Sequence, residues 1–199
     1  RGQVCFDLEG LLDLAAFRKA WRSVLDRHDA LKTLFSDTSS GPVQLVQRVV
    51  EPEWVVPADA RLDRDALHLA ERTKPFDPGR EILCRIAVVQ TGSREHHVCW
   101  TFHHLQTDGW SMPILFEQLF AAYTAFRAGG EPESGPAPRF ARYTEWIASR
   151  DPEATRAFWQ SALAGFQEPN QIARPTTVGG DHGLVTRVLD SASTADLGR

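Results

Sequence analysis

Residues 102–111 read Phe-His-His-Leu-Gln-Thr-Asp-Gly-Trp-Ser, so that two histidines, an aspartate and a glycine follow directly after an apolar run. The segment before them, residues 96–104, has the composition of a strand, and Asp108-Gly109 is a typical turn pair. Ser111 is predicted to be the N-cap of a helix that tolerates Pro113 in its first turn. The junction of a strand, a tight turn and a helix is a usual place for chemistry on an α/β scaffold.

The rest of the chain interleaves strand and helix patterns. Strands are predicted at 4–10, 31–35, 43–50, 82–90, 96–104 and 183–189, and helices at 13–28, 64–73, 111–129, 140–149 and 152–163. The strands and helices do not alternate strictly, as they would in a doubly wound parallel sheet. The pattern therefore predicts an α/β fold, a two-layer sandwich with a mixed β-sheet.

Composition excludes several classes of protein. The 199 residues are 42% apolar and 24% charged, with a formal net charge of -4, which is ordinary for a globular domain or for one lobe of a larger one. Lys and Arg are scattered, so we expect no nucleic-acid partner. The longest apolar stretch, residues 82–89, is too short to cross a membrane and contains Arg85, so no membrane partner is expected.

Cysteine usage bears on the cellular compartment. Cys5, Cys84 and Cys99 lie in apolar surroundings and lack the paired spacing of zinc or redox motifs. They are predicted to be small core residues in a reducing compartment. With no charged-then-apolar leader at the start of the chain, we expect a cytoplasmic protein.

The histidine-rich motif allows three interpretations. A metal site could draw on the residues His96, His97, His103, His104 and Asp108. However, neighbours on a strand point to opposite faces, and no further cluster completes a ligand set, so we predict no bound metal. A polar turn without a function and an acid/base centre are both compatible with the residues alone.

An acid/base role would fall to His104. A neutral imidazole with a pKa of about 6.5 can accept a proton near pH 7. The two-residue period of a strand places His104 on the same face as Val98, Trp100 and Phe102, beside an apolar wall. His103 would face the other way.

Three segments together resemble a known family. His103-His104-x-x-x-Asp108-Gly109, followed by Trp110-Ser111, resembles the signature of condensation domains of nonribosomal peptide synthetases, a branch of the chloramphenicol acetyltransferase-like superfamily. Residues 27–35, Arg-His-Asp-Ala-Leu-Lys-Thr-Leu-Phe, resemble the family's Arg-His-Glu-x-Leu-Arg-Thr-x-Phe segment. Tyr143-x-x-Trp146 resembles its later Tyr/Trp helix motif. The departures, Asp29 for Glu and Lys32 for the second Arg, preserve charge, although Lys cannot form a planar bidentate pair.

The resemblance covers nearly the whole chain but only about half of a condensation domain. The family's opening motif and the motifs of its second half have no counterpart here. We therefore expect residues 1–175 to be the N-terminal lobe, of chloramphenicol acetyltransferase-like fold, and residues 176–199 to begin the crossover to a missing C-terminal lobe.

The resemblance also implies a reaction. An amine on an aminoacyl-phosphopantetheine arm attacks a thioester held on a second carrier protein, forming an amide. The implied catalytic residues are His104, with His103, Asp108 and Gly109. Arg27 is implied to support the motif through a partly buried ion pair with Asp108, and the Gly109 N–H to face the developing oxyanion.

Partners and alternatives follow from the same resemblance. The implied partners are the upstream and downstream peptidyl carrier proteins and the second lobe, and the only implied cofactor is the phosphopantetheine that the carriers deliver.

An epimerisation domain and a non-catalytic platform that recruits a partner enzyme are the alternative functions. The isolated lobe is expected to be inactive, because it lacks one wall of the reaction channel. The amino acids that are joined are not encoded in these motifs.

Overall fold

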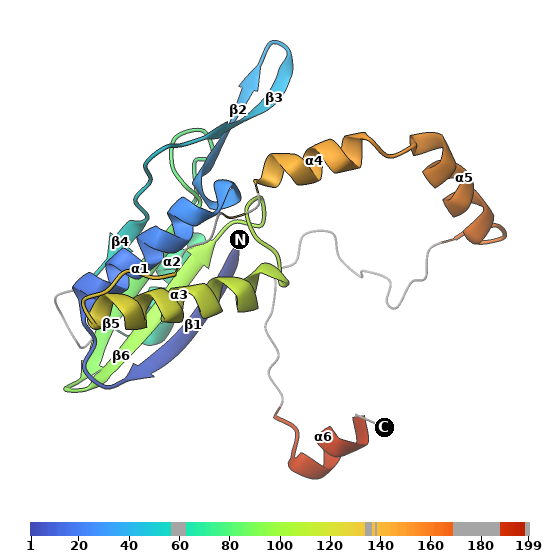
Figure 1. The fold of residues 1–199 in the computed structure, drawn as a ribbon. Coiled ribbons are helices and arrows are strands. Elements are labelled where there is room, and N and C mark those ends of the chain that lie inside the picture. The colour runs from blue at the N-terminus through green and yellow to red at the C-terminus, as the bar shows by residue number, and fades with distance from the viewer. Residues whose placement is uncertain (57–62, 134–136, 138, 169–187, 198–199) are drawn as a thin grey trace. The chain divides into compact units, whose positions relative to one another are not determined.

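The computed structural model describes residues 1–56, 63–133, 137, 139–168 and 188–197. It divides into two compact units, residues 1–150 and residues 151–199. The first unit contains the four-stranded sheet and the helices that pack on it (Figure 1). All the predicted site residues belong to this unit.

The main sheet has the strand order β1-β6-β5-β4. Its members are β1 (Gly2–Glu9), β4 (Glu53–Val55), β5 (Cys84–Gly92) and β6 (Glu95–Phe102). β5 and β6 form the predicted antiparallel hairpin, β1 pairs antiparallel with β6, and β4 runs parallel to β5. The sheet is thus mixed, which confirms the predicted fold class.

Helices α1 (Leu14–Arg27) and α3 (Ser111–Arg127) lie side by side on one face of this sheet (Figure 1). The predicted cap of α1 is confirmed, because the carboxylate of Asp13 accepts a hydrogen bond from the Ala16 N–H at 2.9 Å. The core between the helices and the sheet is aromatic, and the ring centroids of Trp21 and Trp100 lie 5.1 Å apart. Trp100 and Phe102, among the last residues of β6, are part of this core.

The opposite face of the sheet carries α2 (Arg64–Thr73), within the bounds predicted from the sequence. Leu67 of α2 packs against Ala87, Val89 and Cys99, the strand residues that alternate with those facing α1 and α3. β5 is therefore covered on both faces, which explains its nearly continuous apolar run.

Arg85 is the one charged residue of that run, and it is fully buried. Its Nε donates to Glu71 Oε2 at 3.2 Å, and its Nη2 donates to the carbonyl oxygen of Lys74 at 2.7 Å. The guanidinium carbon lies 3.9 Å from the centroid of the Phe76 ring. This single side chain ties the C-terminal end of α2 to the sheet.

A smaller hairpin pairs β2 (Thr33–Thr38) with β3 (Gly41–Val46) and projects from the body of the unit (Figure 1). Strands were predicted at 31–35 and 43–50. The first begins later because residues 29–32 form a 3-10 turn, η1 (Asp29–Lys32), whose hydrogen bonds include that from Thr33 Oγ1 to the Asp29 carbonyl. The second strand ends at Val46, which leaves residues 47–52 to lead into β4.

The remaining helices are α4 (Phe140–Ala148) in the first unit and α5 (Pro152–Ala162) and α6 (Ser191–Leu197) in the second. The predicted helices at 140–149 and 152–163 are confirmed. Most of the strand predicted at 183–189, and the boundary predicted at 175/176, lie outside the described residues. In the described part of the chain, no helix is both long and apolar enough to cross a bilayer.

Candidate active site

The two histidines of the motif follow directly after the last residue of β6. The backbone N–H of His103 still donates to the Leu83 carbonyl at 3.2 Å, after which the chain leaves the sheet. The side chain of His103 is half-buried, whereas that of His104 is exposed. The end of the strand therefore holds His104 at the rim of the lobe.

The ring of His104 is fixed from two sides. Its Nδ1 lies 3.1 Å from the Thr107 carbonyl oxygen, and its centroid lies 5.5 Å from that of Phe102, in an edge-to-face arrangement. The predicted apolar wall is thus present at Phe102. A carbonyl oxygen can only accept, so Nδ1 carries the proton and the lone pair is left on Nε2.

His103 has the opposite tautomer. The Leu105 N–H donates to His103 Nδ1 at 3.1 Å, so in the neutral ring the proton is on Nε2. Burial is the main cause that lowers the pKa of His103. The two neighbouring rings therefore differ, because only His104 offers an Nε2 lone pair.

Asp108 organises the turn between these histidines and α3. Its Oδ1 accepts hydrogen bonds from the Ser111 N–H at 2.9 Å and from the Ser111 hydroxyl at 2.7 Å. These bonds lower the pKa of Asp108. The prediction that Ser111 caps α3 is wrong, since Ser111 is the first helical residue and the capping acceptor is the carboxylate three residues earlier.

The predicted ion pair between Arg27 and Asp108 is also wrong. Both residues are described, and no ion pair joins them, because the exposed Asp108 carboxylate is directed to Ser111. A bond within one turn closes at a much smaller cost in chain entropy than a contact between distant segments. Arg27 ends α1, and its supporting role stays a prediction.

Two residues inside the motif have roles that the sequence did not reveal. Gln106 is buried, and its amide Nε2 donates to the carbonyls of Leu31 and Thr33 at 3.3 and 3.1 Å. Thr107, also buried, supplies the carbonyl that holds His104. Gln106 thus attaches the turn to the η1–β2 segment.

Gly109 is exposed, and its backbone does not require glycine. Its φ lies outside the left-handed region, and a Cβ built on it would meet no atom within 4 Å. No hydrogen bond of its N–H occurs within the described part of the chain. The N–H is therefore available to a group outside the lobe.

A pocket of about 140 Å³ lies on the other side of the turn. Gln106, Thr107, Ser111 and Ile114 line it, together with His28, whose Nε2 contacts Gln118 Oε1 at 2.7 Å. A groove of about 1200 Å³ between α1, α3, residues 131–133 and Ala137 is larger, and His104 lines neither the groove nor the smaller pocket. The smaller pocket is linked to His104 through Thr107, which lines the pocket and whose carbonyl oxygen contacts the His104 ring.

Comparison with known proteins gives a consistent answer. The condensation-domain family model matches residues 2–187. The chain is 37% identical over 169 residues to a linear gramicidin synthase of Brevibacillus parabrevis, an alignment that covers 81% of this chain and 3% of that protein. It is 29% identical over 179 residues to a surfactin synthase of Bacillus subtilis, covering 85% of this chain and 5% of that protein. It therefore spans only a small part of these relatives.

Solved structures show the same fold. The X-domain from teicoplanin biosynthesis is 30% identical, with a TM-score of 0.69 over 82% of this chain and 38% of that structure. The starter condensation domain of rhizomide synthetase RzmA has a TM-score of 0.73, at 22% identity, over 84% of this chain and 43% of that structure. Three motifs, the mixed sheet and the family match agree: the chain belongs to the condensation-domain family of nonribosomal peptide synthetases and corresponds to its N-terminal lobe.

Proposed function

We propose that this lobe supplies the acid/base centre for amide formation between a carrier-bound acyl or peptidyl thioester and a carrier-bound aminoacyl thioester. The observation that carries the proposal is the pair of opposite tautomers at the end of β6. His104 is exposed and presents the Nε2 lone pair, while His103 is half-buried and keeps its proton on Nε2. Only the first can accept a proton from an incoming amine.

Each residue of the turn has a separate role in this reaction. Nε2 of His104 hydrogen-bonds the attacking amine and accepts its proton, and the Thr107 carbonyl stabilises the resulting imidazolium through Nδ1–H. The amine nitrogen adds to the thioester carbonyl and forms the C–N bond of a tetrahedral oxyanion. Its collapse breaks the C–S bond, and the proton held by His104 passes to the leaving thiolate. The Gly109 N–H can donate to the transient oxyanion, and Asp108 keeps the turn in shape.

The remaining requirements lie outside this lobe. Two carrier proteins deliver the substrates on phosphopantetheine arms, and a second lobe closes the channel and excludes water. The pocket beside Thr107 is open enough to receive part of one arm or of an aminoacyl side chain.

A second function is favoured by one comparison. The X-domain of teicoplanin biosynthesis, solved in complex with OxyB, is 28% identical over 89% of this chain. The alternative is therefore a lobe that recruits a partner enzyme and carries out no transfer. The presence of the complete motif in the turn, with His104, Asp108 and Gly109, argues against this alternative. Epimerisation is a third use of the same histidines and would need an acid from the second lobe.

The test is peptide transfer by the protein that contains both lobes. With both carriers loaded, His104→Ala should lower dipeptidyl-carrier formation, followed by mass spectrometry, about 100-fold or more. His96→Ala, a change of the same residue type at the other end of β6, should retain the rate.

Each remaining outcome identifies a different function. Transfer at the parental rate by a folded His104→Ala protein would contradict the proposal. Chiral analysis of the carrier-bound residue would reveal epimerisation. Transfer by neither protein, with retention of OxyB by the immobilised two-lobed protein, would favour recruitment.

A further inference from the structure

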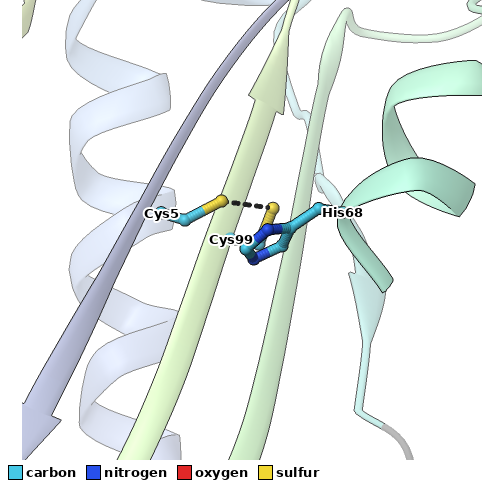
Figure 2. A group of neighbouring side chains, drawn as sticks. All are labelled: Cys5, His68 and Cys99. Atoms are coloured by element: carbon cyan, nitrogen blue, oxygen red, sulfur yellow. Dashed lines mark hydrogen bonds between the residues drawn. The ribbon is translucent and has the colours of Figure 1, made fainter. Parts of the chain in front are cut away.

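A second cluster of reactive side chains lies on the sheet face opposite α1 and α3. Cys5 on β1 and Cys99 on β6 are paired residues in the antiparallel register, and their sulfurs are 3.0 Å apart. His68 of α2 lies beside them, so that one ligand atom from each of the three residues falls within 4.8 Å of the others. Figure 2 shows the three side chains converging from β1, β6 and α2.

We propose that Cys5, Cys99 and His68 form a zinc site that fastens α2 to the sheet, which replaces the sequence-based expectation of no bound metal. Two thiolates and one imidazole are ligands that zinc prefers, and they would occupy three of its four tetrahedral positions. Cys5 and His68 are only half-buried, so a water molecule or an external thiol can reach the fourth position. The reaction at His104 does not use this site, because it faces the other side of the sheet.

The His68 ring is oriented for such a role by groups behind it. The carboxylate of Asp7 accepts from His97 Nδ1 at 2.7 Å, which leaves Nε2 of a neutral His97 as an acceptor. His97 Nε2 lies 2.7 Å from His68 Nε2, so His68 donates there and keeps its lone pair on Nδ1. An imidazole ligand whose second nitrogen donates to a fixed acceptor is the usual arrangement around zinc.

The change needed on binding is small. Two sulfurs on a tetrahedral zinc with bonds of about 2.3 Å lie roughly 3.8 Å apart, so the observed 3.0 Å must widen. We expect the movement to come from the Cys5 side chain, which is half-buried and lies on the edge strand β1. Each thiol gives up its proton: one Zn²⁺ and two S–H groups yield two Zn–S bonds and two H⁺.

The test uses the full chain, purified without a polyhistidine tag, reduced and freed of metal with a chelator. Titration with Co²⁺ should produce a thiolate-to-cobalt charge-transfer band that saturates at one equivalent and is abolished by one equivalent of Zn²⁺. Cys5→Ser and Cys99→Ser should lose the band, and His68→Gln should weaken cobalt binding at least tenfold. Cys84→Ala, which removes the thiol on the other face, should keep it.

A measurement on the unaltered chain guards against misfolded variants. Zn²⁺ should slow the alkylation of Cys5 by N-ethylmaleimide, mapped by mass spectrometry, and raise the melting temperature. The proposal is overturned if the reduced chain shows no cobalt band and Zn²⁺ does not protect Cys5 from alkylation. This holds also if, under mild oxidation, the two cysteines form a disulfide. It is also overturned if the band survives both cysteine variants, since the ion would then be held elsewhere.

Discussion

At the scale of single residues, the site depends on a hydrogen bond that sets a tautomer. His103 and His104 are chemically identical and adjacent, yet the Leu105 N–H and the Thr107 carbonyl select opposite protonation patterns. The selection is made by the backbone of a five-residue turn, so it does not depend on a charged partner. A structural role for Asp108 is consistent with this, since its carboxylate acts on Ser111 and not on either ring.

A substitution at Gly109 should affect activity without affecting stability. Gly109→Ala should leave the melting temperature of the lobe unchanged or slightly raised, because the added methyl group meets no atom and φ is not left-handed. Peptide transfer by the two-lobed protein should fall about 10- to 100-fold, because the methyl group displaces the substrate. Thermal melts and the carrier-transfer assay measure the two effects. A large loss of stability would show that the glycine serves the fold.

At the scale of elements, α3 begins where Asp108 places it. The pKa of this carboxyl is lowered in the folded state, so its contribution to stability is present above the unfolded pKa of about 3.9 and is lost as the pH falls through the folded pKa. The difference in melting temperature between the parent and Asp108→Ala should therefore be largest near neutral pH and vanish in strong acid.

Ser111→Ala serves as the matched control for this experiment. This variant loses the hydrogen bond from the Ser111 hydroxyl to Asp108 and keeps the one from the Ser111 N–H. Its melting temperature at neutral pH should therefore lie between those of the parent and Asp108→Ala. A difference between parent and Asp108→Ala that persists undiminished at the lowest pH would mean that the charge of Asp108 is not what stabilises α3.

Arg85 contributes to the attachment of α2 to the sheet. Arg85→Ala should lower the free energy of unfolding by about 3–5 kcal/mol, because it leaves the buried Glu71 carboxylate without its cation. The double variant Arg85→Met, Glu71→Leu should recover most of the loss, since two apolar side chains leave no buried charge. Urea denaturation of the three proteins measures this. Equal losses in the single and double variants would show that the backbone carbonyls bound by Arg85 are the more important partners.

At the scale of the whole lobe, three exposed apolar side chains surround the motif: Leu105, Trp110 and Ile114 are 52%, 87% and 53% exposed. A patch of this kind next to a reaction centre favours association. We expect the 199-residue chain alone to self-associate in sedimentation velocity and to be silent in the transfer assay. Addition of the second lobe should restore both a defined complex and turnover.

A surface variant tests where the association occurs. Trp110→Ser should reduce self-association, whereas Leu45→Ser on the β2–β3 hairpin should not, although that side chain is also 49% exposed. A monomeric lobe that turns over loaded carriers at the rate of the complete domain would disprove the half-site argument.

Elements with a regular hydrophobic pattern were predicted from the sequence. A very short strand, and contacts that depend on the folded backbone, were not. The β5–β6 hairpin, α2 and the placement of His104 followed from alternation, helical spacing and the motif. β4 has three residues, too few for a pattern to show. The capping of α3 by Asp108 was missed because an aspartate can serve a local turn or a distant arginine, and only the backbone geometry decides between them. The convergence of Cys5 and Cys99 depends on a strand register that spacing along the chain does not reveal.

That register also has a consequence for synthesis on the ribosome. Cys5 and Cys99 are partners across β1 and β6 but are 94 residues apart in the chain. At about 5–20 residues per second, β1 leaves the ribosome roughly 5–20 s before β6 is available to pair with it. During that interval its backbone groups are an open template for other strands, and the Cys5 thiol is unprotected from oxidants. β1 is made before the other strands of this sheet but pairs only after β6 has been made, so we expect a nascent-chain chaperone that shields residues 2–9 to improve the yield of folded protein.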